Sequence, residues 1–368
     1  MHPCLILCLL GSLPALSGAS PFPRRRPSNP GKTVDVKSLM LLMMNDEEDG
    51  SGFDFDLPAY PNCPFGCQCN MKVVQCSDLG LHYVPNDIPA DTRLLDLQAN
   101  HITEIREHDF KNLHSLYALV LVNNLISKVH PRAFLPMGRM EKLYLSHNRL
   151  TTVPRNLPPL LEELRIHDNN IKKIESRTFA GLHKMNCIEL GRNPIKNSGL
   201  EPGAFDGLHL NFLRISEAKL TSIPKDLPDS LRELHLDNNQ IQSIGPEDLR
   251  HYGELYRLGL GYNKIRHIEF GGLYYVQNLR ELHLNHNLLS SVPSGLPEMK
   301  YLQVVYLHSN NISQVAVDAF CPASFSVKKT FYNSISLYDN PVHYWEVQPA
   351  TFRCVSDRRA VQLGNYKK

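Results

Sequence analysis

One apolar pattern recurs along most of this chain, and it restricts the fold more than any other feature of the sequence. Leu116, Leu119, Leu121, Asn124 and Ile126 fit the pattern L-x-x-L-x-L-x-x-N-x-L at every position. Eleven copies share this frame, with asparagine at positions 100, 124, 148, 169, 193, 239, 263, 287, 310 and 340 and with Ala218 in the remaining copy. Repetition at a spacing of roughly 20 to 29 residues indicates a solenoid of leucine-rich repeats.

The alternation within each copy predicts how a repeat folds. The apolar positions point inward, and the short alternating segment forms one strand of a parallel sheet. We therefore predict an α/β leucine-rich-repeat solenoid with a curved parallel β-sheet on its concave face. Short helical turns are expected in the longer repeats, where Phe110, Phe134 and Phe179 point inward. Because the repeated asparagine satisfies backbone groups in the turn, Ala218 predicts a locally different turn after Arg214.

The outward strand positions are the main candidates for function. They should form an exposed face that suits an extended protein partner, and they include Tyr144, Arg165, Glu189, Arg214, His235 and Tyr306. By contrast, catalysis has no candidate residues, because the sequence contains no Gly-x-Ser-x-Gly elbow, phosphate loop or H-E-x-x-H motif. The sequence therefore predicts a protein that is not an enzyme.

Seventeen histidines raise the alternative of a metal site, most clearly at His283, His286 and His308. Metal ligands have to converge on one point, and no carboxylate is reliably placed beside these side chains. We expect neither a metal nor another cofactor.

The ends of the chain predict export. Residues 1–19 place the apolar run from Leu5 to Leu10 before small residues, which is the order of a signal peptide. No later stretch approaches the roughly 20 apolar residues of a membrane span, so we expect a secreted protein without a membrane anchor. The formal net charge of +2 gives no reason to expect nucleic-acid binding.

The charge changes sign between Asn45 and Asp46. Residues 20–45 carry a surplus of four positive charges, whereas acidic residues follow at once. This region is rich in proline and charge and lacks periodicity, so it is interpreted as disordered. The acidic part contains Asp49-Gly50-Ser51-Gly52, which has the features of a xylosyl acceptor: a serine hydroxyl before glycine, with acidic residues nearby. Ser51 is therefore the candidate for glycosaminoglycan attachment, and a plain flexible linker is the alternative.

A second modification site is predicted at Asn311. Asn311-Ile312-Ser313 is the one N-x-S/T sequence with an allowed middle residue, and it follows a predicted strand. Surface exposure, and hence N-glycosylation, is expected there.

The cysteines predict caps for the ends of the solenoid. Cys63, Cys67, Cys69 and Cys76 form C-x3-C-x-C-x6-C directly before the first repeat, where a disulfide cap is favoured over a zinc site. Four cysteines alone permit three pairings. Cys321 and Cys354 bracket an unusually long interval, and pairing them would clip an extended repeat to the C-terminal cap. Cys187 remains, at an outward position where it faces the concave surface or acts as a small strand residue without a role.

Together, the cysteine spacing, the alternation of 21- and 24-residue repeats and the long Cys321 to Cys354 interval resemble the class I small leucine-rich proteoglycans. The resemblance implies the disulfides Cys63–Cys69, Cys67–Cys76 and Cys321–Cys354. It also implies this organisation: signal peptide 1–19, propeptide 20–45, acidic glycosaminoglycan-attachment arm 46–62, N-terminal cysteine cap 63–91, leucine-rich repeats 92–320, and ear repeat with C-terminal cap 321–368.

The same resemblance implies a function in the extracellular matrix. A core protein of this class is expected to bind fibrillar collagen and growth factors such as transforming growth factor beta and to modulate collagen fibril assembly, and a homodimer is left open. Arg214 and Glu217 match the basic and acidic members of the segment that relatives use for collagen. The alternative is a soluble leucine-rich-repeat recognition ectodomain without a glycosaminoglycan.

Overall fold

The computed structural model describes residues 34–37, 39, 63–322 and 332–364. The chain forms two compact units, which are treated separately below. Unit 1 contains Met1–Asn170 and Gly181–Ile188, and unit 2 contains Ile171–Ala180 and Glu189–Lys368. The division falls within strand β9 (Cys187–Glu189).

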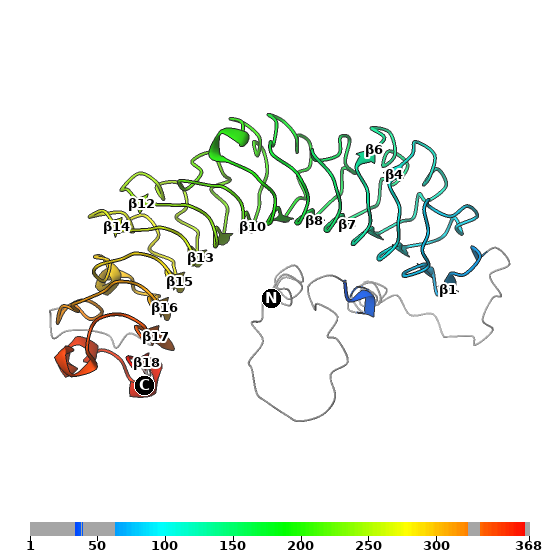
Figure 1. Cartoon of the computed structure of the whole chain (residues 1–368). Helices are drawn as coiled ribbons and strands as arrows, with labels where there is room; N and C mark the ends of the chain where they lie inside the picture. Colours follow the sequence, from blue (N-terminus) through cyan, green and yellow to red (C-terminus); the bar gives the residue numbers. More distant parts are fainter. Residues whose placement is uncertain (1–33, 38, 40–62, 323–331, 365–368) are drawn as a thin grey trace, which may run out of the picture. The chain divides into compact units, whose positions relative to one another are not determined.

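Unit 1 is a stack of repeats that each contribute one short strand to a sheet. The sheet order is β1-β2-β3-β5-β7-β8, in which β1 and β2 are antiparallel and every later pair is parallel. A second small sheet, β4 with β6, lies on the other side of the repeats (Figure 1). The strands are β1 (Gln68–Asn70), β2 (Val73–Gln75), β3 (Leu94–Asp96), β4 (Glu104–Ile105), β5 (Ala118–Val120), β6 (Lys128–Val129), β7 (Lys142–Tyr144) and β8 (Glu163–Arg165).

Unit 2 repeats the same design with parallel pairs throughout, in the order β10-β11-β13-β15-β16-β17-β18. Strands β12 and β14 pair on the opposite side. The strands are β10 (Phe212–Arg214), β11 (Glu233–His235), β12 (Ser243–Ile244), β13 (Arg257–Gly259), β14 (His267–Ile268), β15 (Glu281–His283), β16 (Val304–Tyr306), β17 (Ser334–Ser336) and β18 (Val361–Gln362).

Helical structure in the described repeats is limited to short 3₁₀ segments. They are η1 (Asn197–Gly199), η2 (Leu296–Glu298), η3 (Tyr344–Glu346), η4 (Pro349–Phe352) and η5 (Arg358–Ala360). The inward phenylalanines are buried as predicted, and Phe110 stacks on Phe134 with ring centroids 6.4 Å apart. The predicted leucine-rich-repeat solenoid with a parallel sheet and disulfide-capped ends is confirmed.

The repeated asparagine connects neighbouring repeats through backbone groups. Asn124 is typical: its Nδ2 donates to the carbonyls of Leu97 at 2.9 Å and Leu121 at 3.3 Å, and its Oδ1 accepts from the Ile102 amide at 3.0 Å. These groups are buried and would otherwise lack partners, which costs about 1 to 3 kcal/mol for each. The asparagine ladder therefore stabilises the turn after the sheet strand in each repeat that carries the asparagine.

The residue before each ladder position adopts a left-handed backbone. The eleven residues have φ between 53° and 58°, and none is glycine: Ala99, Asn123, His147, Asp168, Arg192, Glu217, Asn238, Tyr262, His286, Ser309 and Asp339. We call them the left-handed row. Because each is followed by a ladder position, the same turn recurs in every repeat.

The turn at Ala218 corrects one expectation. Glu217 has φ of 55°, like Arg192 at 53° and Asn238 at 56°, so the turn itself is not different. The missing asparagine changes one hydrogen bond in the preceding repeat. There the Ile195 amide donates to the Asn193 carbonyl at 2.8 Å instead of to a side chain. A local backbone bond thus replaces the lost acceptor, and the backbone direction is preserved.

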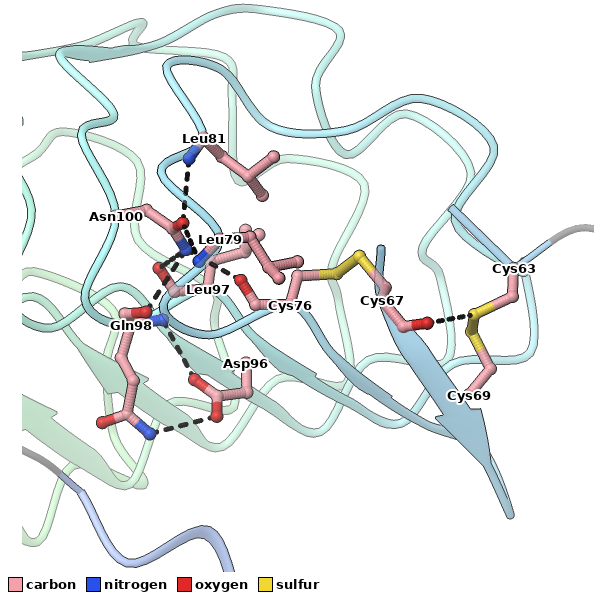
Figure 2. Close-up of a disulfide and its surroundings, with 10 residues drawn as sticks. All are labelled: Cys63, Cys67, Cys69, Cys76, Leu79, Leu81, Asp96, Leu97, Gln98 and Asn100. Atoms are coloured by element: carbon pink, nitrogen blue, oxygen red, sulfur yellow. Dashed lines mark hydrogen bonds between the residues drawn. A yellow bond between two sulfur atoms is a disulfide. The ribbon is translucent and has the colours of Figure 1, made fainter. Parts of the chain in front are cut away.

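Disulfides close both ends, with the pairings that the family resemblance implied. Cys63 pairs with Cys69 and Cys67 with Cys76 in the N-terminal cap (Figure 2), and Cys321 pairs with Cys354. Asn100 extends the ladder into the cap, because its Nδ2 donates to the Cys76 carbonyl at 2.8 Å.

Cys187 does not present a thiol on the surface. Its side chain is fully buried although the repeat frame assigns it an outward position, and it belongs to no disulfide among the described residues. Exposure at an outward position therefore depends on what the neighbouring repeats place beside it.

Candidate binding surface on the strand face

The outward side chains of the sheet strands define a strand face in each unit. In unit 2 this face carries a row of acidic and basic side chains, which we call the charge ladder. Its members are Glu189, Arg214, Glu233, His235, Asp237, Arg257, Glu281 and His283. Some of these side chains meet across neighbouring strands that pair in register, and the others pair with a residue two positions away in the same repeat.

The two residues predicted for collagen binding lie on this face but do not pair with each other. Arg214 Nη1 lies 3.3 Å from Glu189 Oε1 in the preceding repeat, and the Arg214 side chain is 24% exposed. Glu217, one of the left-handed row, accepts from Arg192 Nε at 2.8 Å at the edge of the sheet. The structure therefore arranges four charges as two adjacent ion pairs, each joining one repeat to the next.

His235 lies at the centre of the charge ladder between two carboxylates. Its Nε2 lies 3.1 Å from Glu233 Oε2, and its Nδ1 lies 3.8 Å from Asp237 Oδ2. Burial opposes a charged imidazole, but the neighbouring carboxylates of Asp237 and Glu233 outweigh it and raise the pKa of His235. Burial likewise opposes the charge of Glu233, yet its bonds with His235 and Tyr256 outweigh this and lower the pKa of Glu233.

The next repeats continue the alternation of charge. Arg257 Nε lies 3.3 Å from Glu281 Oε2, and His283 Nε2 lies 3.5 Å from the same oxygen. The interaction with His283 lowers the pKa of Glu281. The charges on this part of the face are thus already paired within the protein, so a partner has to compete with them or add to them.

Stacked rings follow toward the C-terminal end of unit 2. Tyr262 stacks on His286 with centroids 4.0 Å apart, and His308 stacks on Tyr338 at 4.4 Å. The His286 and His308 rings meet edge to face at 5.5 Å. Burial, together with neighbouring histidines, lowers the pKa of His308 to about 4. These histidines make ring contacts, and in the described ranges no group of three His, Cys, Asp or Glu residues could hold a metal ion.

The strand face of unit 1 differs from the expected exposed surface. Tyr144, which was expected to be exposed, is fully buried. Lys142 Nζ lies 3.3 Å from Glu163 Oε2, with side chains only 4% and 1% exposed. Glu163 also accepts from Arg165 Nε at 2.6 Å. The outward positions here form a closed layer instead of an open charged surface.

Of the predicted modification sites, the structure describes Asn311 but not Ser51. Ser51 and the charge reversal at Asn45 and Asp46 lie outside the described residues. Asn311 is exposed in the turn after β16, and Ser313 of the same sequon is exposed as well. The acceptor side chain is therefore accessible at the predicted N-glycosylation site.

Sequence reasoning missed most of the ion pairs, although a signal was present. Some of the pairs join opposite charges at equivalent positions of neighbouring copies, such as Lys142 and Glu163, which are 21 residues apart, and Glu189 and Arg214, which are 25 apart. Aligning the copies by their asparagines would have revealed these columns. The repeat fold with its paired columns thus defines a leucine-rich-repeat protein.

Comparison with known families agrees with this architecture. The family described as "Leucine rich repeat" matches residues 92–150, 159–220 and 229–289, and "Leucine rich repeat N-terminal domain" matches residues 62–89. A solved structure described as an octameric complex of Latrophilin 3, Unc5D and FLRT2 contains a similar chain, with a TM-score of 0.62 and 27% identity over 80% of this chain and 81% of that one.

Curated relatives resemble the chain over nearly its whole length. Biglycan of Homo sapiens is 61% identical over 98% of each chain, and biglycan of Canis lupus familiaris is 59% identical over 98% of this chain and 99% of its own. Biglycan of Xenopus laevis is 61% identical over 89% of this chain and 91% of its own. The chain therefore belongs to the class I small leucine-rich proteoglycans, the family of biglycan.

Membership establishes the general role. The chain is a secreted, non-enzymatic proteoglycan core protein of the extracellular matrix, with disulfide-capped leucine-rich repeats. In the described part of the chain, no helix has the length and apolar character needed to cross a membrane.

Several sequence segments point to biglycan rather than to decorin or asporin. The acidic run from Asp46 to Asp49 is shorter than asporin's aspartate tract, and Cys187 is unlike decorin. Two features depart from the biglycan pattern: Ser51-Gly52 is the single Ser-Gly pair of the acidic arm, and Phe270-Gly271 stands where the family often has a second sequon.

Proposed function

We propose that this core protein binds fibrillar collagen through the charge ladder of unit 2 and the adjacent Glu217, with Arg214 and Glu217 as the principal contacts. The observation that carries the proposal is the row of opposite charges at outward positions. A collagen triple helix is a long rod with charged side chains at regular intervals, so complementary charges on successive strands suit it better than a deep pocket does. Through this contact the protein would modulate fibril assembly.

Two further features belong to the proposal. Ser51 carries the glycosaminoglycan, and Asn311 carries an N-glycan. Growth factors such as transforming growth factor beta bind to the same core protein, and the core protein can also form a homodimer. Support for Asn311 comes from its exposure in the turn, whereas Ser51 is supported by its sequence context and by the family.

Binding to reconstituted collagen fibrils tests the proposed contacts, using core protein from which chondroitinase has removed the glycosaminoglycan. Arg214→Ala and Glu217→Ala should each weaken binding several-fold, and added salt should weaken binding by the parent protein because exposed charges are screened. Arg250→Ala is a matched control, because Arg250 pairs with Glu247 at 3.0 Å away from the strand face. Equal binding by all the folded variants would exclude this site.

Processing and attachment are tested separately. We propose that a tolloid-type metalloproteinase cleaves between Asn45 and Asp46, leaving the acidic arm 46–62 at the new N-terminus. N-terminal sequencing of secreted material should find Asp46, and a chain beginning near Pro21 would contradict this. A shift in gel mobility after chondroitinase is expected, whereas an unchanged sharp band would favour a soluble recognition ectodomain without a glycosaminoglycan.

A further inference from the structure

A short segment of the N-terminal region lies on the strand face of unit 1. Val36 is 7% exposed and Leu39 is fully buried, although both belong to the region before the cysteine cap. They form one apolar cluster with outward residues of the unit 1 sheet, namely Val73, Leu94, Tyr117, Ala118, Val120, Val122 and Tyr144. The closed layer on this face is therefore completed by residues that lie outside the repeats.

The local structure of the segment explains how two aliphatic side chains reach the same surface. Val36, Lys37 and Leu39 are helical, and the Asp35 carboxylate accepts from the Lys37 amide at 3.1 Å, as a helix N-cap does. Residues three apart on a helix share a face, so Val36 and Leu39 point the same way. Lys37 is exposed. The segment thus has one apolar side, which faces the sheet.

The sheet also recognises the backbone of the segment. The Val34 amide donates to Gln98 Oε1 at 2.9 Å, and Gln98 Nε2 donates to the Val34 carbonyl at 3.3 Å. Gln98 is held for this contact because its Nε2 also donates to Asp96 Oδ2 at 3.0 Å (Figure 2). One side chain therefore satisfies both polar groups of Val34 in the way that a neighbouring strand would.

We propose that the strand face of unit 1 is a docking site for a short aliphatic segment, that Val34–Leu39 is its first occupant, and that removal of residues 20–45 vacates it. The release step rests on the cleavage proposed above. Two aliphatic side chains and one pair of hydrogen bonds form a contact far smaller than a standard stable interface. Covalent attachment maintains this contact through a high local concentration, which cleavage abolishes.

The consequence is a precursor and a processed chain with different surfaces. In the precursor, Val120 and Val122 are covered, whereas the processed chain presents them beside Tyr117 and the amide of Gln98. A segment that binds this face after cleavage should resemble Val34–Leu39. It should have two aliphatic side chains on one side, and an unpaired backbone amide and carbonyl two residues before the first of them.

Hydroxyl-radical footprinting of the secreted chain tests docking. The full chain is kept as the precursor by Asp46→Ala, and the labelling of Tyr117 and Tyr144 is compared with that of Tyr306 and Tyr338 in unit 2. Combining Val36→Asp with Leu39→Asp should raise labelling of the first two tyrosines several-fold and leave the other two unchanged. Lys37→Asp is the matched control, because it changes charge on the exposed side of the same turn and should leave all four tyrosines unchanged.

Release is tested on the cleaved chain. Its Tyr117 and Tyr144 should be labelled as in the doubly substituted precursor, and a synthetic peptide of residues 31–44 should restore protection where the same peptide with Val36→Asp does not. Equal labelling of the precursor and its doubly substituted variant would overturn docking, and protection that persists after cleavage would overturn release. Neither readout uses collagen or a glycosaminoglycan, so failure here is distinct from failure of the proposed collagen contact.

Discussion

The strand faces of the two units use the same positions of the repeat but have opposite surfaces. In unit 1, outward residues such as Val120 and Val122 are apolar and buried. In unit 2, the equivalent positions hold charged side chains that remain partly accessible, with Arg214 24% and His235 15% exposed. The inward leucines and ladder asparagines occupy the same positions in both units, so they do not determine what either face binds. The comparison shows that the outward positions determine recognition and can change while the fold remains constant.

The largest expected contrast concerns ion pairs on the two faces. Glu163→Ala in unit 1 leaves Lys142 buried without its carboxylate, which should lower the free energy of unfolding by about 3 to 5 kcal/mol. Glu281→Ala in unit 2 removes a carboxylate that is 33% exposed and should cost about 1 kcal/mol or less. Urea denaturation of the secreted variants measures both changes. Similar losses at the two sites would mean that the faces do not differ in the way their burial indicates.

A second prediction concerns the ladder, where the units should not differ. Asn124→Ala in unit 1 and Asn239→Ala in unit 2 each remove four hydrogen bonds, at least three of them buried, so each should lower stability by about 2 to 4 kcal/mol. Ala218→Asn should stabilise unit 2 by about 1 kcal/mol or less, because the Ile195 amide already has a backbone partner.

Thermal unfolding followed by circular dichroism measures these three variants. A large gain from Ala218→Asn would show that the local bond at Ile195 compensates poorly. Clearly unequal losses at Asn124 and Asn239 would show that the inward frame differs between the units after all.

The smallest effect is a pH dependence on the face of unit 2. The pKa of His308 is lowered to about 4 by burial and by neighbouring histidines, against about 6.5 in an unfolded chain. The folded state binds fewer protons in this range, so the contribution of His308 is complete above about pH 6.5 and is lost as pH falls toward 4. His308→Phe keeps the stacking on Tyr338 and should reduce the acid destabilisation by about 1 kcal/mol. Denaturation midpoints at pH 7 and pH 4.5 measure the difference, and an unchanged slope would contradict it.

His235 should behave in the opposite way. Its pKa is raised by the neighbouring carboxylates of Asp237 and Glu233, so its contribution is present below pH 6.5 and is lost as pH rises through the raised pKa. The pKa values of these two histidines are therefore shifted in opposite directions, because His235 lies between carboxylates and His308 lies among aromatic rings and other histidines.

The inward side of each repeat could be predicted from the sequence. The repeated leucines pack in the core, and the repeated asparagines bond the turn backbone, at the same positions of every copy that has them. Asn124 and Phe110 occupy their predicted places for this reason. The outward half depends on neighbours at a distance in the sequence. Tyr144 was expected to be exposed and is buried, since its environment includes Val36 and Leu39, about 100 residues before it. The partners of Arg214 and Glu217 lie one repeat earlier, which a single copy of the pattern cannot show.

The left-handed row has a consequence for how such a surface can evolve. A left-handed backbone costs an ordinary residue roughly 1 kcal/mol, so glycine would be the usual choice at these places. The row instead contains eleven other side chains, among them Tyr262, His286 and Glu217. Since neighbouring asparagines hold most of these turns, the side chain is free to vary with little structural effect. The edge of the sheet is therefore a line of interchangeable positions along which new specificities can arise one substitution at a time.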